Sequence, residues 1–193
     1  DIQMDLNRRA PGQSEITTDR KEEDKVEILS GTFKEKTTGS PIALIIYNND
    51  YKKEDYKNIS ESYRPSHSDF TWESKYSIRD PNGGGRTSAR MTAGNVAAAS
   101  IAKKILKEKF STEIVAYVKK IRDIEAEIDP NDVKKKDIEE NIVRCPDIKA
   151  AKEMVELIKI TKDQGDSLGG IIECVIKNLP VGLGQPIFDK LDA

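Results

Sequence analysis

The sequence has few of the residues that bind transition metals or cross-link a chain. One histidine and two cysteines occur in 193 residues, and Cys145 and Cys174 lie too far apart to form a zinc-binding pair. We therefore predict no metal site. The two thiols are expected to be reduced and structural, as is usual inside the cell.

Long apolar runs and an excess of charge of one sign are also missing. No segment approaches the length of a membrane span and no leader pattern precedes the chain, so we expect a soluble, cytoplasmic protein without membrane contact. Lysine and arginine total 32 against 34 acidic residues, and this net charge of −2 argues against nucleic acid as a partner. The length suits a single domain over residues 1–193.

Positive charge is nevertheless concentrated between Arg64 and Arg90, where five basic residues stand against three acidic ones. The same stretch contains His67 and three consecutive glycines at 83–85. Glycine lacks a Cβ atom, so the backbone there can approach a bound group closely. This local excess of cations suits a small anionic ligand better than a nucleic-acid duplex.

A helix is predicted directly after the glycines. Thr87 or Ser88 offers a hydroxyl group for the N-cap of this helix. Small and apolar residues then recur with helical spacing, which predicts a buried stripe. The members of the stripe are Ala89, Ala93, Ala97, Ile101 and Ile105.

The first turn of the predicted helix carries Arg86 and Arg90 without a neighbouring acid. Because a helix N-terminus already has a partial positive charge, two arginines are unfavourable there unless an anion binds. Together with the glycines and His67, they favour an anion site. The alternative is a simple glycine turn, with both arginines paired to acids from elsewhere in the chain.

The rest of the chain alternates irregularly between strand and helix patterns. Strands are predicted from β-branched and apolar content at residues 26–30, 42–47, 111–118 and 171–176. The first two are separated by a turn-like segment and should pair antiparallel. An amphipathic helix is predicted after Asp147, and we interpret the charged segment 119–145 as a surface excursion. This order of elements predicts an α+β fold.

Several segments, taken in order, resemble the chorismate synthase family. They are NRRAPGQSEITTDRKEEDKVEILSGTF, KTTGSPIALII, RPSHSDFTWESKYSIRD, GGGRTSAR with TAGNVAAASIAKKIL, GDSLGGIIECVI and LPVGLGQPIFDKLDA. The resemblance covers nearly the whole chain, and GGGRTSAR before an alanine-rich helix is specific to that family. It implies a layered sandwich of helices between antiparallel β-sheets, in keeping with the predicted α+β fold.

The resemblance also implies a lyase of the shikimate pathway of aromatic amino acid biosynthesis. The family converts 5-enolpyruvylshikimate 3-phosphate to chorismate and phosphate by a 1,4-elimination. It requires reduced FMN although the reaction has no net redox change, and it assembles as a homotetramer. The sequence leaves open whether NADPH or an external partner reduces the flavin.

Site residues follow from the same resemblance. Substrate-binding roles are implied for Arg9, Arg64 and Arg90. Flavin-binding roles are implied for Arg86, Thr87 and Ser88. His67 matches an active-site histidine of the family that is thought to donate a proton or a hydrogen bond to the reduced flavin. Arginine suits such a site because its planar fork binds oxyanions through two parallel hydrogen bonds and stays charged.

The chain departs from the family pattern at Ala10, Glu15, Glu35 and Met91. Glu15 replaces a position that is often basic, and Glu35 replaces a glycine. The family's GESHG segment with a second histidine, and its C-terminal half with an RxDP aspartate, have no counterpart here. We therefore expect the middle portion of such an enzyme, inactive alone. The alternative function is a non-catalytic assembly or anion-binding module that retains the fold.

Overall fold

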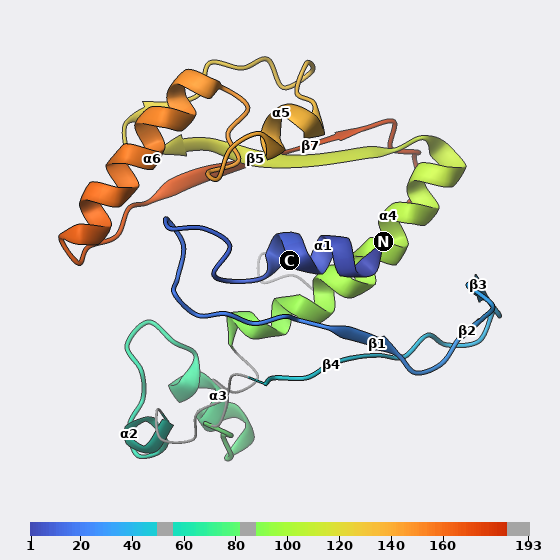
Figure 1. Cartoon of the computed structure of the whole chain (residues 1–193). Helices are drawn as coiled ribbons and strands as arrows, with labels where there is room; N and C mark the ends of the chain where they lie inside the picture. The colour runs from blue at the N-terminus through green and yellow to red at the C-terminus, as the bar shows by residue number, and fades with distance from the viewer. Residues whose placement is uncertain (50–55, 82–87, 185–193) are drawn as a thin grey trace. The chain divides into compact units, whose positions relative to one another are not determined.

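The computed structural model describes residues 1–49, 56–81 and 88–184 (Figure 1). The chain forms two compact units, Asp1–Ala102 and Lys103–Ala193, and helix α4 (Thr92–Phe110) runs across the division between them. The prediction of a single domain stays a prediction, and each unit is described by itself below.

In the first unit, helix α1 (Ile2–Arg9) packs against the start of α4 (Figure 1). Leu6 of α1 is fully buried against Ala93 and Ala97 of α4, and the two alanines allow the helices to approach closely. The predicted stripe is therefore confirmed at its centre. Its ends differ, because Ala89 belongs to the short 3₁₀ helix η3 (Ala89–Met91) and Ile105 is half exposed.

The predicted antiparallel pair is confirmed. Strand β1 (Val26–Ile28) pairs with β4 (Leu44–Ile46), and Val26, Leu44 and Ile46 pack against the helical core. The segment between them contains a small hairpin of β2 (Thr32–Phe33) and β3 (Lys36–Thr37). Lys34 and Glu35 form its two-residue turn with φ values of 46° and 62°. Positive φ at both turn residues normally favours glycine or asparagine.

Two further helices lie in the first unit, α2 (Lys57–Ser60) and α3 (Asp69–Tyr76). Sequence analysis did not predict them, because α3 has no apolar stripe and buries only Asp69. Its packing is instead polar and aromatic. Tyr63 and Phe70 meet edge to face, with ring centroids 5.5 Å apart.

The second unit is a three-stranded antiparallel sheet in the order β6-β5-β7 with helices beside it (Figure 1). The strands are β5 (Glu113–Ile121), β6 (Ile124–Glu125) and β7 (Gly170–Lys177). The helices are α5 (Lys135–Glu139) and α6 (Ile148–Asp163). Asp147 caps α6 by accepting hydrogen bonds from two backbone N–H groups, as predicted for a helix that starts there.

The interpretation of residues 119–145 as a surface excursion is wrong. Val133 and Ile138 from this segment pack on Tyr117 of β5, and Ala126, Val143 and Cys145 are also buried. The charged side chains hide these apolar residues from periodicity analysis, because the residues enter the core singly from loops, turns and the short helix α5. The segment covers one face of the β5–β7 sheet and completes the core of this unit.

The fold class is confirmed as α+β with antiparallel sheets. No helix among the described residues is both long enough and apolar enough to span a membrane.

Candidate functional site

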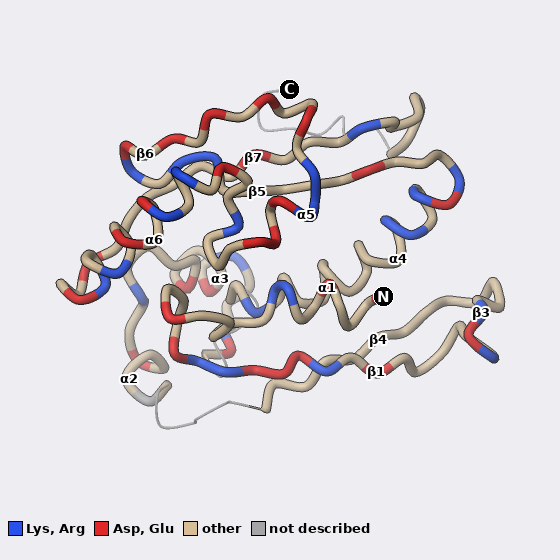
Figure 2. Tube along the Cα trace, turned by 45° about the horizontal axis from the view of Figure 1, so that its top comes forward, with Lys and Arg blue, Asp and Glu red and all other residues tan. Residues whose placement is uncertain are grey.

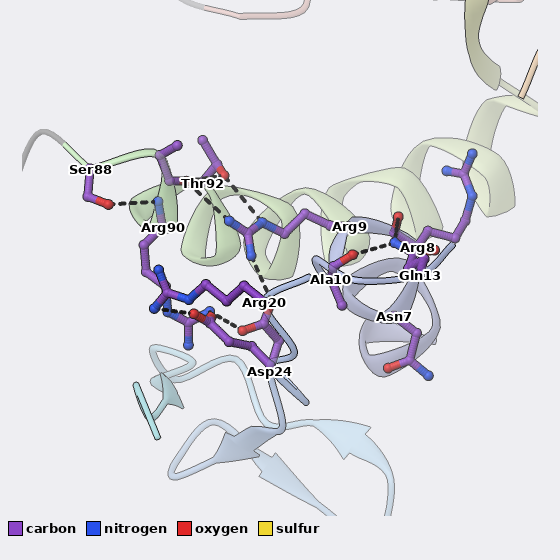
Figure 3. A network of polar contacts seen from close by, with 12 residues as sticks. Asn7, Arg8, Arg9, Ala10, Gln13, Arg20, Asp24, Ser88, Arg90 and Thr92 are labelled. Carbon is purple, nitrogen blue, oxygen red and sulfur yellow. Dashed lines mark hydrogen bonds and ion pairs between the residues drawn. The ribbon is translucent and has the colours of Figure 1, made fainter. Parts of the chain in front are cut away.

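The first group of candidate site residues is built around Asp24. Arg9 Nη1 lies 2.7 Å from Asp24 Oδ2, and Arg90 pairs with Asp24 Oδ1 (Figure 3). The Asp24 side chain has no solvent exposure. One fully buried carboxylate therefore holds two guanidinium groups, one from the end of α1 and one from η3, directly before α4.

A second acid extends this network. Glu22 pairs with Arg20 and with Arg90, and its side chain is 5% exposed. The acids come from the charged segment 19–25, which precedes β1 and carries charges of both signs (Figure 2). We call Arg9, Arg20, Glu22, Asp24 and Arg90 the arginine network. It contains three guanidinium groups and two carboxylates.

Further hydrogen bonds fix both central arginines. Arg9 donates to Thr92 Oγ1 at 3.3 Å and to the Ala89 carbonyl at 3.2 Å, and Arg90 donates to the Tyr47 carbonyl at 2.9 Å. Ser88 Oγ accepts a hydrogen bond from the Arg90 N–H at 3.3 Å, which confirms Ser88 as an N-cap. The start of α4 is thus tied to α1 and to the acidic segment.

Local chain geometry brings the acids to this place. After α1 ends at Arg9, Pro11 and Gly12 reverse the chain, and Gly12 has a φ of 72°. A Cβ atom at Gly12 would overlap the carbonyl oxygen of Arg20, so this close return requires glycine. Gln3 then bridges α1 to β1, since it donates to the Asp24 carbonyl and accepts from the Val26 N–H.

The second group of candidate residues lies at the start of α3. Asp69 accepts hydrogen bonds from Arg64 Nε and Nη2, both at 2.8 Å, and from the Arg64 backbone N–H at 3.2 Å. His67 Nδ1 lies 2.9 Å from Asp69 Oδ1. The Arg64 guanidinium holds the pKa of Asp69 far below its ordinary value, so this carboxyl stays ionised.

Arg79 completes the second group. Its Nη1 lies 3.4 Å from Asp69 Oδ2, its Nε lies 3.5 Å from Glu73 Oε2, and its guanidinium stacks 5.2 Å from the Tyr63 ring centroid. We call Arg64, His67, Asp69, Glu73 and Arg79 the histidine cluster. Its two arginines and two acids balance in charge while His67 is neutral.

The structure thus gathers the described candidates into two groups. Arg9, Arg90 and Ser88 come together in and beside the arginine network, and Arg64 and His67 come together in the histidine cluster. Arg86 and Thr87 lie outside the described residues. For Arg90 the structure agrees with the alternative in which acids from elsewhere compensate the charge.

Sequence reasoning missed the three buried acids Glu22, Asp24 and Asp69. The sequence indicates them only weakly: Glu22 and Asp69 lie within a few residues of an arginine that they contact, and Asp24 lies close to Glu22. Segments rich in charged residues are usually exposed to solvent, so this proximity did not predict burial. Among the described residues, no group of three histidine, cysteine, aspartate or glutamate residues could hold a metal ion.

Comparison with known proteins places the whole chain in one family. The family profile for chorismate synthase matches residues 1–193. The chain is 56% identical to the chorismate synthase of Synechocystis sp. and 54% identical to that of Nostoc punctiforme, in both cases over all 193 residues. It spans about half the length of these curated relatives, 53% of each.

A solved structure supports the same assignment. A crystal structure of chorismate synthase matches 95% of this chain and 51% of its own chain, with a TM-score of 0.63 and 30% sequence identity. Fold, sequence and motifs therefore agree, and this chain belongs to the chorismate synthase family.

Proposed function

We propose that this chain supplies arginine-rich substrate and flavin contacts for a chorismate synthase. The reaction is the 1,4-elimination of phosphate from 5-enolpyruvylshikimate 3-phosphate. One carbon loses a proton and the phosphate leaves with the electron pair of its C–O bond. The electrons of the broken C–H bond supply the additional double bond of chorismate, and the proton is balanced by the phosphate, which is released as hydrogen phosphate. The observation that carries the proposal is that Arg9 and Arg90 meet on the buried carboxylate of Asp24.

The substrate needs such a network because it has a phosphate and two carboxylates. Within the described residues, the contacts of Arg9 and of Arg90 use three of the five N–H donors that each guanidinium has. Asp24 fixes both side chains, so their remaining donors are oriented before an anion arrives. Donors that need no reorganisation stabilise a leaving phosphate more strongly than mobile ones.

Arg64 has a different part in the proposal. Asp69 accepts hydrogen bonds from its Nε and Nη2 and so fixes the guanidinium, and we assign Arg64 a substrate contact because it lies in the family motif RPSH. Glu15, where the family is often basic, is exposed in the loop after α1, and we assign no anion contact to it.

The flavin site is proposed for Arg86, Thr87 and Ser88, of which Ser88 is described. Reduced FMN, when bound, supplies an electron-rich ring beside the substrate. The guanidinium of Arg90, whose backbone N–H donates to Ser88, suits a ligand that carries a phosphate group. His67 is proposed to donate a proton or a hydrogen bond toward that ring.

Binding by this chain tests the proposal directly. We expect calorimetric titration to detect 5-enolpyruvylshikimate 3-phosphate, and anaerobic titration to detect reduced FMN, with tighter flavin binding when substrate is present. Arg9→Gln should weaken substrate binding by roughly 10-fold or more, as expected for a charge-assisted hydrogen bond. Arg9→Lys keeps the positive charge and should lose less substrate affinity than Arg9→Gln.

The matched control is Arg122→Gln, which removes an arginine whose side chain is 62% exposed in the turn after β5. It should bind substrate like the unmodified chain. Equal affinities of Arg9→Gln and Arg122→Gln, with both variants folded by circular dichroism, would refute the substrate role. Absence of both substrate and flavin binding would instead favour the non-catalytic assembly module.

The remaining parts of the proposal have their own tests. If the protein forms a homotetramer, its mass measured by analytical ultracentrifugation should be four times that of one chain. NADPH as the reductant predicts that NADPH alone bleaches bound FMN, whereas an external reductase predicts no bleaching. A cytoplasmic location predicts that the protein fractionates with soluble cytoplasmic enzymes.

A further inference from the structure

The contacts of Asp69 restrict the hydrogen positions on the imidazole of His67. Asp69 is 3% exposed and ionised, so its oxygens can only accept hydrogen bonds. Oδ1 lies 2.9 Å from His67 Nδ1 and also accepts from Arg64 Nη2 at 2.8 Å. A contact of this length to an acceptor requires a hydrogen on Nδ1.

The backbone also fixes the imidazole. The His67 N–H donates to the Arg64 carbonyl at 3.3 Å, which closes a four-residue turn with Pro65 at its second position. Ser66 at the third position has a φ of 56°, as a type II turn requires. Asp69 binds the Arg64 N–H at the beginning of this turn and His67 at its end, so one carboxylate closes the loop from both sides.

The charges around Asp69 determine whether it acts on His67 through its negative charge or through orientation of the ring. Arg64 and Arg79 both contact the carboxylate, and Glu73 contacts Arg79, so cations already offset the charge of Asp69 before His67 is counted. The 2.9 Å contact between His67 Nδ1 and Asp69 Oδ1 remains after this compensation. Asp69 therefore acts on His67 chiefly through orientation and choice of tautomer.

We propose that Asp69 is a positioning residue that holds His67 with its hydrogen on Nδ1 and so makes Nε2 the ring nitrogen that gains and loses a proton. The tautomer stands on the geometry alone. Its importance for catalysis rests on the function proposed above for His67.

Nuclear magnetic resonance can read the tautomer without an activity assay. His67 is the only histidine of the chain, so ¹⁵N-histidine labelling gives one ring to observe in a protein free of histidine tags. The spectrum is read at the high-pH plateau of a pH series. We expect Nδ1 to show the shift of a protonated nitrogen and Nε2 that of an unprotonated one.

Asp69→Asn should reverse this pattern. The Arg64 fork can only donate, so it will take the single amide oxygen, and the amide NH₂ will then face His67 and demand an acceptor at Nδ1. The control is Asp147→Ala, which removes the cap of α6 in the other unit and should leave the His67 spectrum unchanged.

The outcomes separate the two proposals. A hydrogen on Nε2 in the unmodified chain, or an unchanged tautomer in a folded Asp69→Asn variant, would overturn the positioning role. The spectrum of the unmodified chain needs no variant, so the test stands even if Asp69→Asn does not fold. Failure of the substrate titration would remove the proposed function while leaving the measured tautomer intact.

Discussion

Replacement of Asp24 by asparagine should destabilise the first unit strongly. Asparagine has the same shape and tolerates the positive φ of 46° at this position, so the backbone is preserved. What is lost is the fully buried charge that holds Arg9 and Arg90. Breaking a fully buried ion pair costs about 3 to 5 kcal/mol.

The structure sets the size of the expected loss. The two arginine side chains are 21% and 14% exposed, so water can solvate them in part after the change. We therefore expect the free energy of unfolding to fall by about 2 to 4 kcal/mol, near the lower part of the range for buried pairs. With a urea slope of about 2 kcal/mol/M, the midpoint should fall by about 1 to 2 M.

Fluorescence of Trp72 provides the assay. It is the only tryptophan and lies in α3 of the first unit, so it reports unfolding of the unit that contains Asp24. The matched control is Glu23→Gln, which neutralises the exposed neighbouring acid and should stay within about 0.5 kcal/mol of the unmodified chain. Equal urea midpoints of Asp24→Asn and Glu23→Gln would refute the reasoning.

Three further predictions concern other parts of the chain. Glu35→Gly should stabilise the protein by up to about 1 kcal/mol in thermal unfolding, because glycine relieves the φ of 62° in the β2–β3 turn; destabilisation would contradict this. The pKa values of Asp69 and Asp147 lie below their ordinary 3.8, so the unfolded chain binds more protons in acid. The contribution of these two carboxyls to the free energy of unfolding should therefore be constant above about pH 5 and fall progressively below pH 3.8. The fall should be less steep in Asp69→Asn. Equal pH dependence of the two proteins below pH 3.8, measured by urea titration, would contradict this prediction. Tyr117→Phe should cost about 1 to 3 kcal/mol by circular dichroism in urea, because the buried Tyr117 hydroxyl donates to Glu173 and the carboxylate would lose that donor.

The parts of the fold that could be predicted from sequence are those with periodic burial. The alanine stripe at 93 and 97, the antiparallel pair of β1 and β4 and the capped helix α6 all follow from local patterns. The core contribution of residues 119–145 could not, because Val133 and Ile138 enter the core from a segment without period. Long-range packing decides burial there.

Some residues of the candidate site could likewise be predicted from the sequence, and others could not. Arg9, Arg90 and His67 were predicted from residue type, local charge and family motifs, and their roles stay predictions. Glu22, Asp24 and Asp69 were not, because a buried acid and a solvated acid look alike in a sequence. Their burial depends on contacts such as Arg90 with Asp24, which joins positions 66 residues apart.

The proposal as a whole depends on recognition of the phosphate group by the arginine network. The most direct measurement compares the affinity of the chain for 5-enolpyruvylshikimate 3-phosphate with its affinity for the same compound without phosphate, in the unmodified chain and in Arg9→Gln. We predict a preference of roughly 10-fold or more for the phosphorylated compound, which Arg9→Gln reduces. Equal binding of the two compounds by the unmodified chain would contradict the account.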